Sequence, residues 1–91
     1  MKYKIFRTNS FKSDFKKLNN SEKEIFEEVV TKLANGDNLE EKYKDHSLKG
    51  SWNGCRECHL KPDLLLIYKI NNDILELALL KVGSHATIFK K

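Results

Sequence analysis

Leu64-Leu65-Leu66-Ile67-Tyr68 is the longest unbroken apolar run of the chain, and Pro62-Asp63 stands directly before it. A continuous apolar run entered through turn residues is typical of a central strand that is covered on both faces. Similar stretches flank the run, and Asn71-Asn72-Asp73 supplies a short hairpin turn after it. The second half of the chain therefore predicts three strands, over Trp52–Leu60, Leu64–Ile70 and Ile74–Val82.

The first half of the chain predicts one strand and two helices. Met1 to Arg7 alternates in the manner of a strand. Ser10 is a suitable cap for a short helix with an apolar stripe of Phe11, Phe15 and Leu18, which the pair Asn19-Asn20 ends. A capping box at Ser21-Glu22-Lys23-Glu24 opens a second helix, which ends at Asn35-Gly36 and has an apolar face of Ile25, Phe26, Val29, Val30 and Leu33.

These elements predict an α+β fold in the order β-α-α-β-β-β. An antiparallel helical hairpin would pack on one face of a mainly antiparallel sheet, leaving the other face, near the strand ends, for function. Residues 37–47 are polar and are expected to form a loop, and Gly83-Ser84-His85 leads into a last helical turn over Ala86–Phe89. The length of 91 residues allows one domain, which we expect to span residues 1–91.

Composition and charge narrow the class of protein. The chain has 40% hydrophobic residues, Gly 4, Pro 1 and Cys 2, which excludes a disordered, collagen-like or disulfide-rich protein. No apolar run approaches the roughly 20 residues of a membrane span, and charged Arg7 stands where a signal peptide would be apolar. We therefore expect a cytoplasmic protein with reduced thiols and no membrane partner.

The net charge is +4, and residues 46–91 contribute +3 of it, with seven Lys or Arg against four Asp or Glu. A compact basic domain attracts polyanions, of which nucleic acid is the commonest. Ordinary solubility charge is the alternative explanation.

Cys55-Arg56-Glu57-Cys58-His59 has the spacing of a haem attachment motif. On a strand, however, residues three apart point to opposite faces, which argues against haem attachment and a helical redox pair alike. No second cysteine pair completes a structural zinc set. Both cysteines are therefore expected to be small, buried or half-buried thiols.

The three histidines of the chain, His46, His59 and His85, all stand beside predicted turns or strand ends. If they converge, they suit either metal binding or general acid–base chemistry, and Asp63 adds a carboxylate to either. The cations of the same region favour a phosphodiester substrate over a metal ion, because negative charge accumulates during its cleavage; they are Lys49, Arg56, Lys61 and Lys81.

Trp52 and Phe89 offer rings on which a base can stack, so the whole set fits metal-independent RNA cleavage with the 2′-OH as nucleophile. The competing interpretation places both rings in the core and leaves the lysines as a solvated surface.

Three motifs decide between these interpretations, namely Asp45-His46-Ser47-Leu48-Lys49-Gly50-Ser51-Trp52, Arg56-Glu57-Cys58-His59-Leu60-Lys61-Pro62-Asp63 and Gly83-Ser84-His85 with Phe89. They resemble the YafQ branch of the RelE/ParE toxin superfamily, in detail over residues 43–89 and in layout alone over residues 1–42. The resemblance implies a RelE/ParE-like microbial RNase fold and a toxin of a type II toxin–antitoxin system. Such toxins are ribosome-dependent endoribonucleases, or mRNA interferases, which use no metal or other cofactor.

The resemblance also implies roles for single residues. His85 matches the C-terminal catalytic histidine and is expected to protonate the leaving 5′-oxygen. One of His46, His59 and Asp63 activates the 2′-OH, and Glu57, on the same strand face as His59, is a further candidate base. Arg56 and Lys81 are expected to contact the scissile phosphate, and Phe89 is expected to contact a nucleobase. Lys49 and Lys61 are expected to be further cations of the site.

Partners follow from the same resemblance. We expect a cognate antitoxin, often a ribbon-helix-helix protein, which covers or distorts the site. Operator DNA is contacted only through that antitoxin, and the substrate is mRNA on the ribosome.

Two positions depart from the family. Leu64 follows Asp63 where some relatives have tryptophan. Lys81 stands where relatives usually have arginine, so the planar guanidinium that can bind phosphate with two hydrogen bonds is absent. A catalytically weakened RNA- or antitoxin-binding homologue is therefore one alternative. A ParE-like toxin that binds DNA gyrase without catalysis is another, although such a binder needs no histidines.

Overall fold

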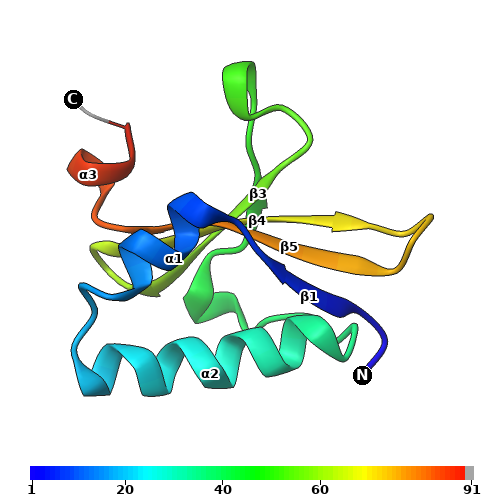
Figure 1. Ribbon diagram of the computed structural model, residues 1–91, viewed down its shortest axis with the longest axis horizontal. Coiled ribbons are helices and arrows are strands. Elements are labelled where there is room, and N and C mark those ends of the chain that lie inside the picture. The colour runs from blue at the N-terminus through cyan, green and yellow to red at the C-terminus, as the bar shows by residue number, and fades with distance from the viewer. Residues whose placement is uncertain (90–91) are drawn as a thin grey trace.

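The computed structural model describes residues 1–89 and contains a five-stranded sheet in the order β1-β5-β4-β3-β2 (Figure 1). Its strands are β1 (Lys4–Arg7), β2 (His46–Ser47), β3 (Arg56–Lys61), β4 (Leu64–Asn71) and β5 (Glu76–Gly83). The helices are α1 (Asn9–Phe15), α2 (Asn20–Ala34) and α3 (His85–Phe89), with 3-10 turns η1 (Glu41–Tyr43) and η2 (Gly50–Trp52). Only β1 and β5 pair in parallel, so the predicted α+β fold with a mainly antiparallel sheet is confirmed.

The helices begin at caps other than those predicted. Thr8, not Ser10, caps α1 by accepting a hydrogen bond from the Phe11 N–H at 3.1 Å. At α2 the capping box joins Asn19 and Glu22, with N···O distances of 2.8 and 2.9 Å, so Ser21 lies inside the helix. Asparagine caps a helix as well as serine does, and the residues that were expected to end α1 therefore start α2.

The strand boundaries also shift. The chain between Gly50 and Gly54 forms η2 and a turn, so β3 begins only at Arg56 and not at Trp52. The hairpin turn after β4 extends to Leu75, a residue with φ of +50°, and β5 begins at Glu76. The polar segment predicted as loop contains η1 and the short strand β2, which pairs with β3.

β4 lies in the middle of the sheet and is buried on both faces, as predicted. Leu66 and Tyr68 join the larger core cluster, which α1 and α2 cover with residues such as Phe11, Phe26 and Val29. Leu65 and Ile67 point to the other face, where Ile88 of α3 buries them together with the half-buried Leu48, Trp52, Cys55, Leu80 and Phe89. The second face is therefore partly closed by α3 and η2, and the remainder carries the polar side chains described below.

α1 covers the part of the β5 edge that does not pair with β1. β1 pairs with β5 only as far as Leu79. Beyond it, the Thr8 hydroxyl donates to the Leu79 carbonyl at 3.1 Å, and an Asp14 carboxylate oxygen accepts from the Val82 N–H at 3.2 Å. The Leu79 carbonyl also accepts from the Thr8 N–H at 3.2 Å, so it is the Val82 N–H that Asp14 keeps from lying unpaired at the sheet edge. No helix within residues 1–89 is long and apolar enough to cross a membrane.

The double burial of β4 makes a stability prediction. Ile67→Ala removes a side chain that is 0% exposed and should lower the free energy of unfolding by about 2–5 kcal/mol. The matched control Ile74→Ala truncates a side chain that is 62% exposed and should cost less than about 0.5 kcal/mol. Urea denaturation of the two variants measures both values, and equal losses would contradict the assignment of β4 as the doubly buried strand.

Candidate active site on the second face of the sheet

The strand register brings polar residues together on the second face. His46 on β2 pairs with Glu57 on β3, and Glu57 pairs with Ile67 on β4. His59 lies two residues further along β3 and so points to the same side as Glu57. β2 is the edge strand, so this cluster of His46, Glu57 and His59 is open to solvent. It lies beside the smaller core cluster that contains Ile67.

Glu57 links the two histidines. Its Oε1 atom lies 3.4 Å from His46 Nε2 and 3.5 Å from His59 Nε2, and the two imidazole rings are 6.3 Å apart. Within residues 1–89, Glu57 is the buried charged residue, at 5% exposure. A buried carboxylate is costly unless hydrogen-bond donors or cations compensate it, and an imidazole does so when the nitrogen that faces the carboxylate carries a proton. The cluster can therefore accept, hold and release a proton.

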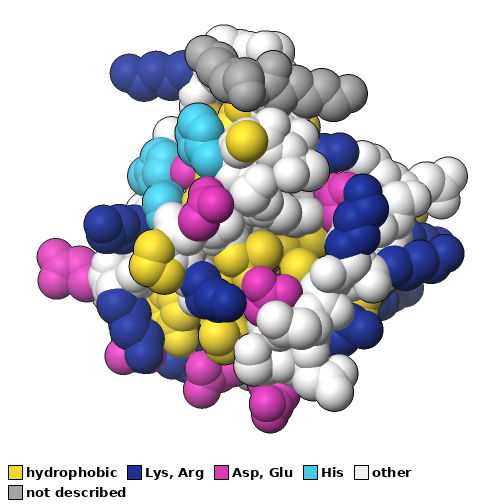
Figure 2. Space-filling model, turned by 90° about the vertical axis from the view of Figure 1, so that its left-hand side faces the viewer, with side chains coloured by type: hydrophobic (Ala, Val, Ile, Leu, Met, Phe, Trp, Pro, Cys, Tyr) yellow, Lys and Arg dark blue, Asp and Glu magenta, His cyan; other side chains and the backbone are white. Residues whose placement is uncertain are grey.

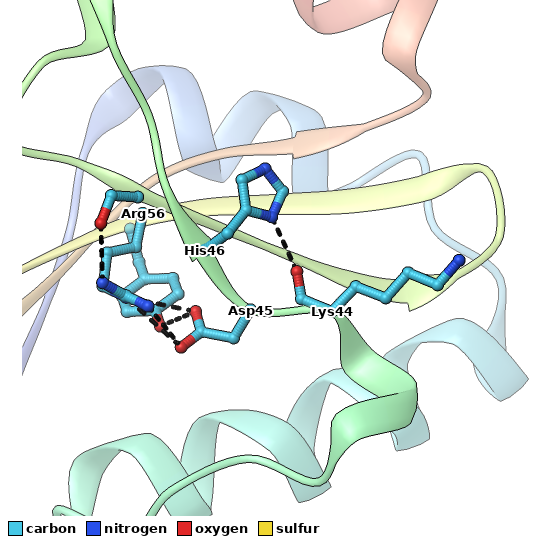
Figure 3. Close-up of polar contacts among 6 residues, drawn as sticks. Lys44, Asp45, His46 and Arg56 are labelled. Atoms are coloured by element: carbon cyan, nitrogen blue, oxygen red, sulfur yellow. Dashed lines mark hydrogen bonds and ion pairs between the residues drawn. The ribbon is translucent and has the colours of Figure 1, made fainter.

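The His46 ring has a defined orientation. A ring nitrogen, Nδ1, lies 2.7 Å from the Lys44 carbonyl oxygen (Figure 3). Because a carbonyl only accepts hydrogen bonds, Nδ1 carries the hydrogen, and Nε2 is left facing Glu57.

His85 approaches from α3. Its backbone N–H donates to Asp63 Oδ1 at 3.4 Å, and the Ser84 hydroxyl accepts from the Thr87 N–H at 3.1 Å. Its ring lies 4.7 Å from the Phe89 ring, which in turn meets Trp52 edge-on at 6.4 Å. Figure 2 shows the histidine side chains gathered on one face of the molecule, with acidic side chains among them. The fold thus places the three histidines, whose convergence the sequence left open, on one face of the molecule.

Lys81 lies on the same face by register, opposite Ile67, but it contacts α1. Its Nζ atom is 2.7 Å from Ser10 Oγ and 3.6 Å from Asp14 Oδ2. Two strand spacings, about 10 Å, separate it from Glu57. Lys81 is therefore paired with an acidic residue of α1 and does not join the histidine cluster.

Arg56 corrects the sequence prediction, because it points away from the histidines. It pairs with Tyr68, whose side chain belongs to the larger core under α2, so Arg56 occupies the opposite face from Glu57 and His59. Its guanidinium binds Asp45 Oδ2 at 3.0 Å and Ser47 Oγ at 3.0 Å. The alternation of a strand places it there, and its expected contact with the scissile phosphate does not fit this position.

A groove of about 440 Å³ adjoins His59. Lys61 lines it and also reaches Glu22 of α2, with Nζ and Oε2 3.4 Å apart. Lys42 and Lys44 line the same groove; the sequence assigned neither of them a role, although both stand shortly before His46 in the chain. Lys49 is exposed in the chain between β2 and η2.

The cysteines are free thiols on opposite faces, as predicted: Cys58 is buried in the larger core and Cys55 is half-buried against the smaller one. Burial raises the pKa of the Cys58 thiol to about 12. Within residues 1–89, no three His, Cys, Asp or Glu side chains form a group that could hold a metal ion.

Comparison of the sequence with known proteins identifies the family to which the chain belongs. The sequence model of the bacterial toxin of type II toxin–antitoxin systems, YafQ, matches residues 3–90. The mRNA interferase toxin YafQ of Escherichia coli (strain K12) is 47% identical over 47 residues, which make up 52% of this chain and 49% of that protein. In such alignments the chain spans about half the length of the curated relatives it matches.

Solved structures match over more of the chain. A metal-bound toxin from Helicobacter pylori is 39% identical with a TM-score of 0.86, and the match covers 96% of this chain and 99% of that one. A chain of the E. coli DinJ-YafQ toxin-antitoxin complex is 32% identical with a TM-score of 0.84, covering 98% of this chain and 99% of that one. The shared fold therefore includes both the helices and the histidine-bearing face.

The two thiols should differ in reactivity. At about pH 8, Cys55 should react with a thiol reagent in the native protein, whereas Cys58 should not, because its pKa of about 12 keeps it protonated and its side chain is buried. Mass spectrometry of the labelled chain, with and without denaturant, counts the modified sites. Native labelling of Cys58 at the rate of Cys55 would contradict the burial of β3.

Proposed function

Because the chain belongs to the YafQ family of bacterial toxins of type II toxin–antitoxin systems, we propose that it is an mRNA interferase, a ribosome-dependent endoribonuclease. Its residues 1–91 would form one toxin domain. The observation that carries the proposal is the Glu57 carboxylate shared by His46 and His59, on a face where histidine side chains gather (Figure 2). Acid–base groups in that arrangement are what RNA cleavage through the 2′-OH requires.

In the proposed reaction, the 2′-oxygen attacks the adjacent phosphorus while the bond from phosphorus to the 5′-oxygen breaks. The cluster of Glu57, His46 and His59 takes the proton from the 2′-OH, and His85 gives a proton to the departing 5′-oxygen. The products are a 2′,3′-cyclic phosphate and a 5′-hydroxyl, so protons and charge balance. Asp63 acts as a positioning residue in this scheme, because its carboxylate accepts the His85 N–H and not a proton of the substrate.

Binding of the RNA chain is proposed to use the basic surface beside the cluster. Lys61, Lys42 and Lys44 line the groove that reaches His59, and Lys49 extends the positive charge. Phe89, half-buried between His85 and Trp52, offers its ring to a nucleobase. Cations at this place also stabilise the negative charge that develops on the phosphate.

The partner is proposed to be an antitoxin. A solved YafQ structure contains its antitoxin DinJ, and its toxin fold covers this chain almost entirely. We propose that a ribbon-helix-helix antitoxin binds this chain likewise, so that operator DNA is reached only through it. The site of action would be the ribosome in the cytoplasm.

Mapping of mRNA 5′ ends shortly after induction tests the function. The wild-type chain should produce new ends within codons and in frame, whereas His85→Ala should produce none. Glu57→Gln, which keeps the shape and removes the charge of the shared carboxylate, should reduce cleavage about 100-fold. The surface variant Glu40→Gln, which breaks only an exposed pair with Lys32, should cleave like wild type.

The alternatives give different results. Growth arrest without new 5′ ends, together with a DNA damage response, would indicate a gyrase-binding toxin. Ribosome binding without new ends would indicate a homologue that has lost catalysis. Equal cleavage by wild type and His85→Ala would remove His85 from the catalytic set.

A further inference from the structure

We infer that Asp45, Arg56 and Tyr68, on the opposite face of the sheet from the histidines, form an anchor that positions His46. These three side chains touch neither Glu57 nor His59 and would act through the backbone on either side of His46. The catalytic consequence rests on the proposed function, whereas the control of the His46 ring by the anchor can be measured without it.

The strand that carries His46 needs such an anchor. β2 has two residues, His46 and Ser47, both exposed, and it pairs only with Glu57 and Arg56 at the edge of the sheet. So short a ladder supplies few backbone hydrogen bonds, and solvent-exposed edge segments of this kind open locally at little cost in free energy. A catalytic histidine on β2 therefore depends on side-chain contacts for a fixed position.

Arg56 holds both neighbours of His46. Its Nη2 and Nε atoms lie 3.0 and 3.3 Å from Asp45 Oδ2, and its Nη1 atom donates to Ser47 Oγ at 3.0 Å. The planar guanidinium thus spans the backbone from residue 45 to residue 47 with fixed geometry, which a lysine could not do. In Figure 3 these contacts lie on one side of β2 and the His46 ring lies on the other.

Tyr68 ties the anchor to the rigid centre of the sheet. It is 1% exposed in β4, and its hydroxyl donates to Asp45 Oδ1. Burial, and then this hydrogen bond, raise the pKa of Tyr68 far above its usual range, so the hydroxyl keeps the proton that it donates. Asp45 consequently receives hydrogen bonds from a core tyrosine and from an arginine at the same time.

The anchor bears directly on the proton positions at His46. Asp45 lies between Lys44, whose φ is +50°, and His46, so holding Asp45 also holds the Lys44 carbonyl that receives the Nδ1 hydrogen. With Nδ1 fixed in this way, Nε2 stays aimed at Glu57. Release of Asp45 would free both the ring orientation and the tautomer.

Heteronuclear NMR of the imidazole nitrogens tests the positioning directly. At about pH 8, wild-type His46 should show a protonated Nδ1, because this nitrogen faces the Lys44 carbonyl oxygen. Asp45→Asn and Tyr68→Phe should each mix the tautomers or broaden the His46 signals, and leave those of His85 unchanged. Tyr3→Phe is the matched control, since it removes another buried tyrosine hydroxyl, which donates to Asn72 at 2.6 Å, and it should alter nothing.

A double-mutant cycle in a ribosome-dependent cleavage assay tests the catalytic consequence. Asp45→Asn should lower the cleavage rate about 10-fold or more in the wild-type background, and by less than about 2-fold when His46→Ala is already present. Tyr68→Phe should follow the same pattern with a smaller loss, and it replaces Asp45→Asn if that variant does not fold.

The outcomes separate the two proposals. Unchanged His46 signals in both Asp45→Asn and Tyr68→Phe would overturn the anchor, whether or not the chain cleaves RNA. Equal rate losses in the two backgrounds would assign Asp45 a general structural role and overturn positioning through His46. A wild-type chain that does not cleave RNA would overturn the proposed function alone, and the NMR result would still decide the anchor.

Discussion

The burial of β4 on both of its faces is the constraint on which the other features depend. Leu66 and Tyr68 pack under α1 and α2, while Leu65 and Ile67 pack under α3 and η2. A strand covered in this way can only be central, and it divides the molecule into a helical face and a histidine face. Its register to the neighbouring strands places Glu57, Arg56 and Lys81.

The two faces have complementary roles. On one, the buried Glu57 carboxylate lies 3.4 and 3.5 Å from two imidazole nitrogens, so acid–base side chains are grouped at one place. On the other, Asp45, Arg56 and Tyr68 hold the short strand that brings one of those imidazoles to the edge. Because neighbouring residues of a strand point to opposite sides, Arg56 and Glu57 contribute to different networks.

The course of the chain was predictable where local patterns are strong. The apolar run of β4, the amphipathic α2 and the turns around them follow from periodicity, and the spacing of the histidine motifs indicated the family. Helix starts were missed because asparagine and serine cap equally well, and only the side-chain geometry of Asn19 distinguishes them. β2 was missed because two residues have no periodicity; pairing with β3 alone makes them a strand.

The sequence by itself determined the central strand, the two helices, the free thiols on opposite faces and the chemical types of the site, since each depends on residue identity and local spacing. Only the tertiary structure decided which polar residues meet. It brings His46 on β2 next to Glu57 on β3 and pairs Lys81 with Asp14. It also places Arg56 on the face opposite the histidines, where Arg56 binds Asp45. The reason is physical: contacts between strands depend on register and on side-chain direction, and both are set by the packing of the whole sheet against its two cores.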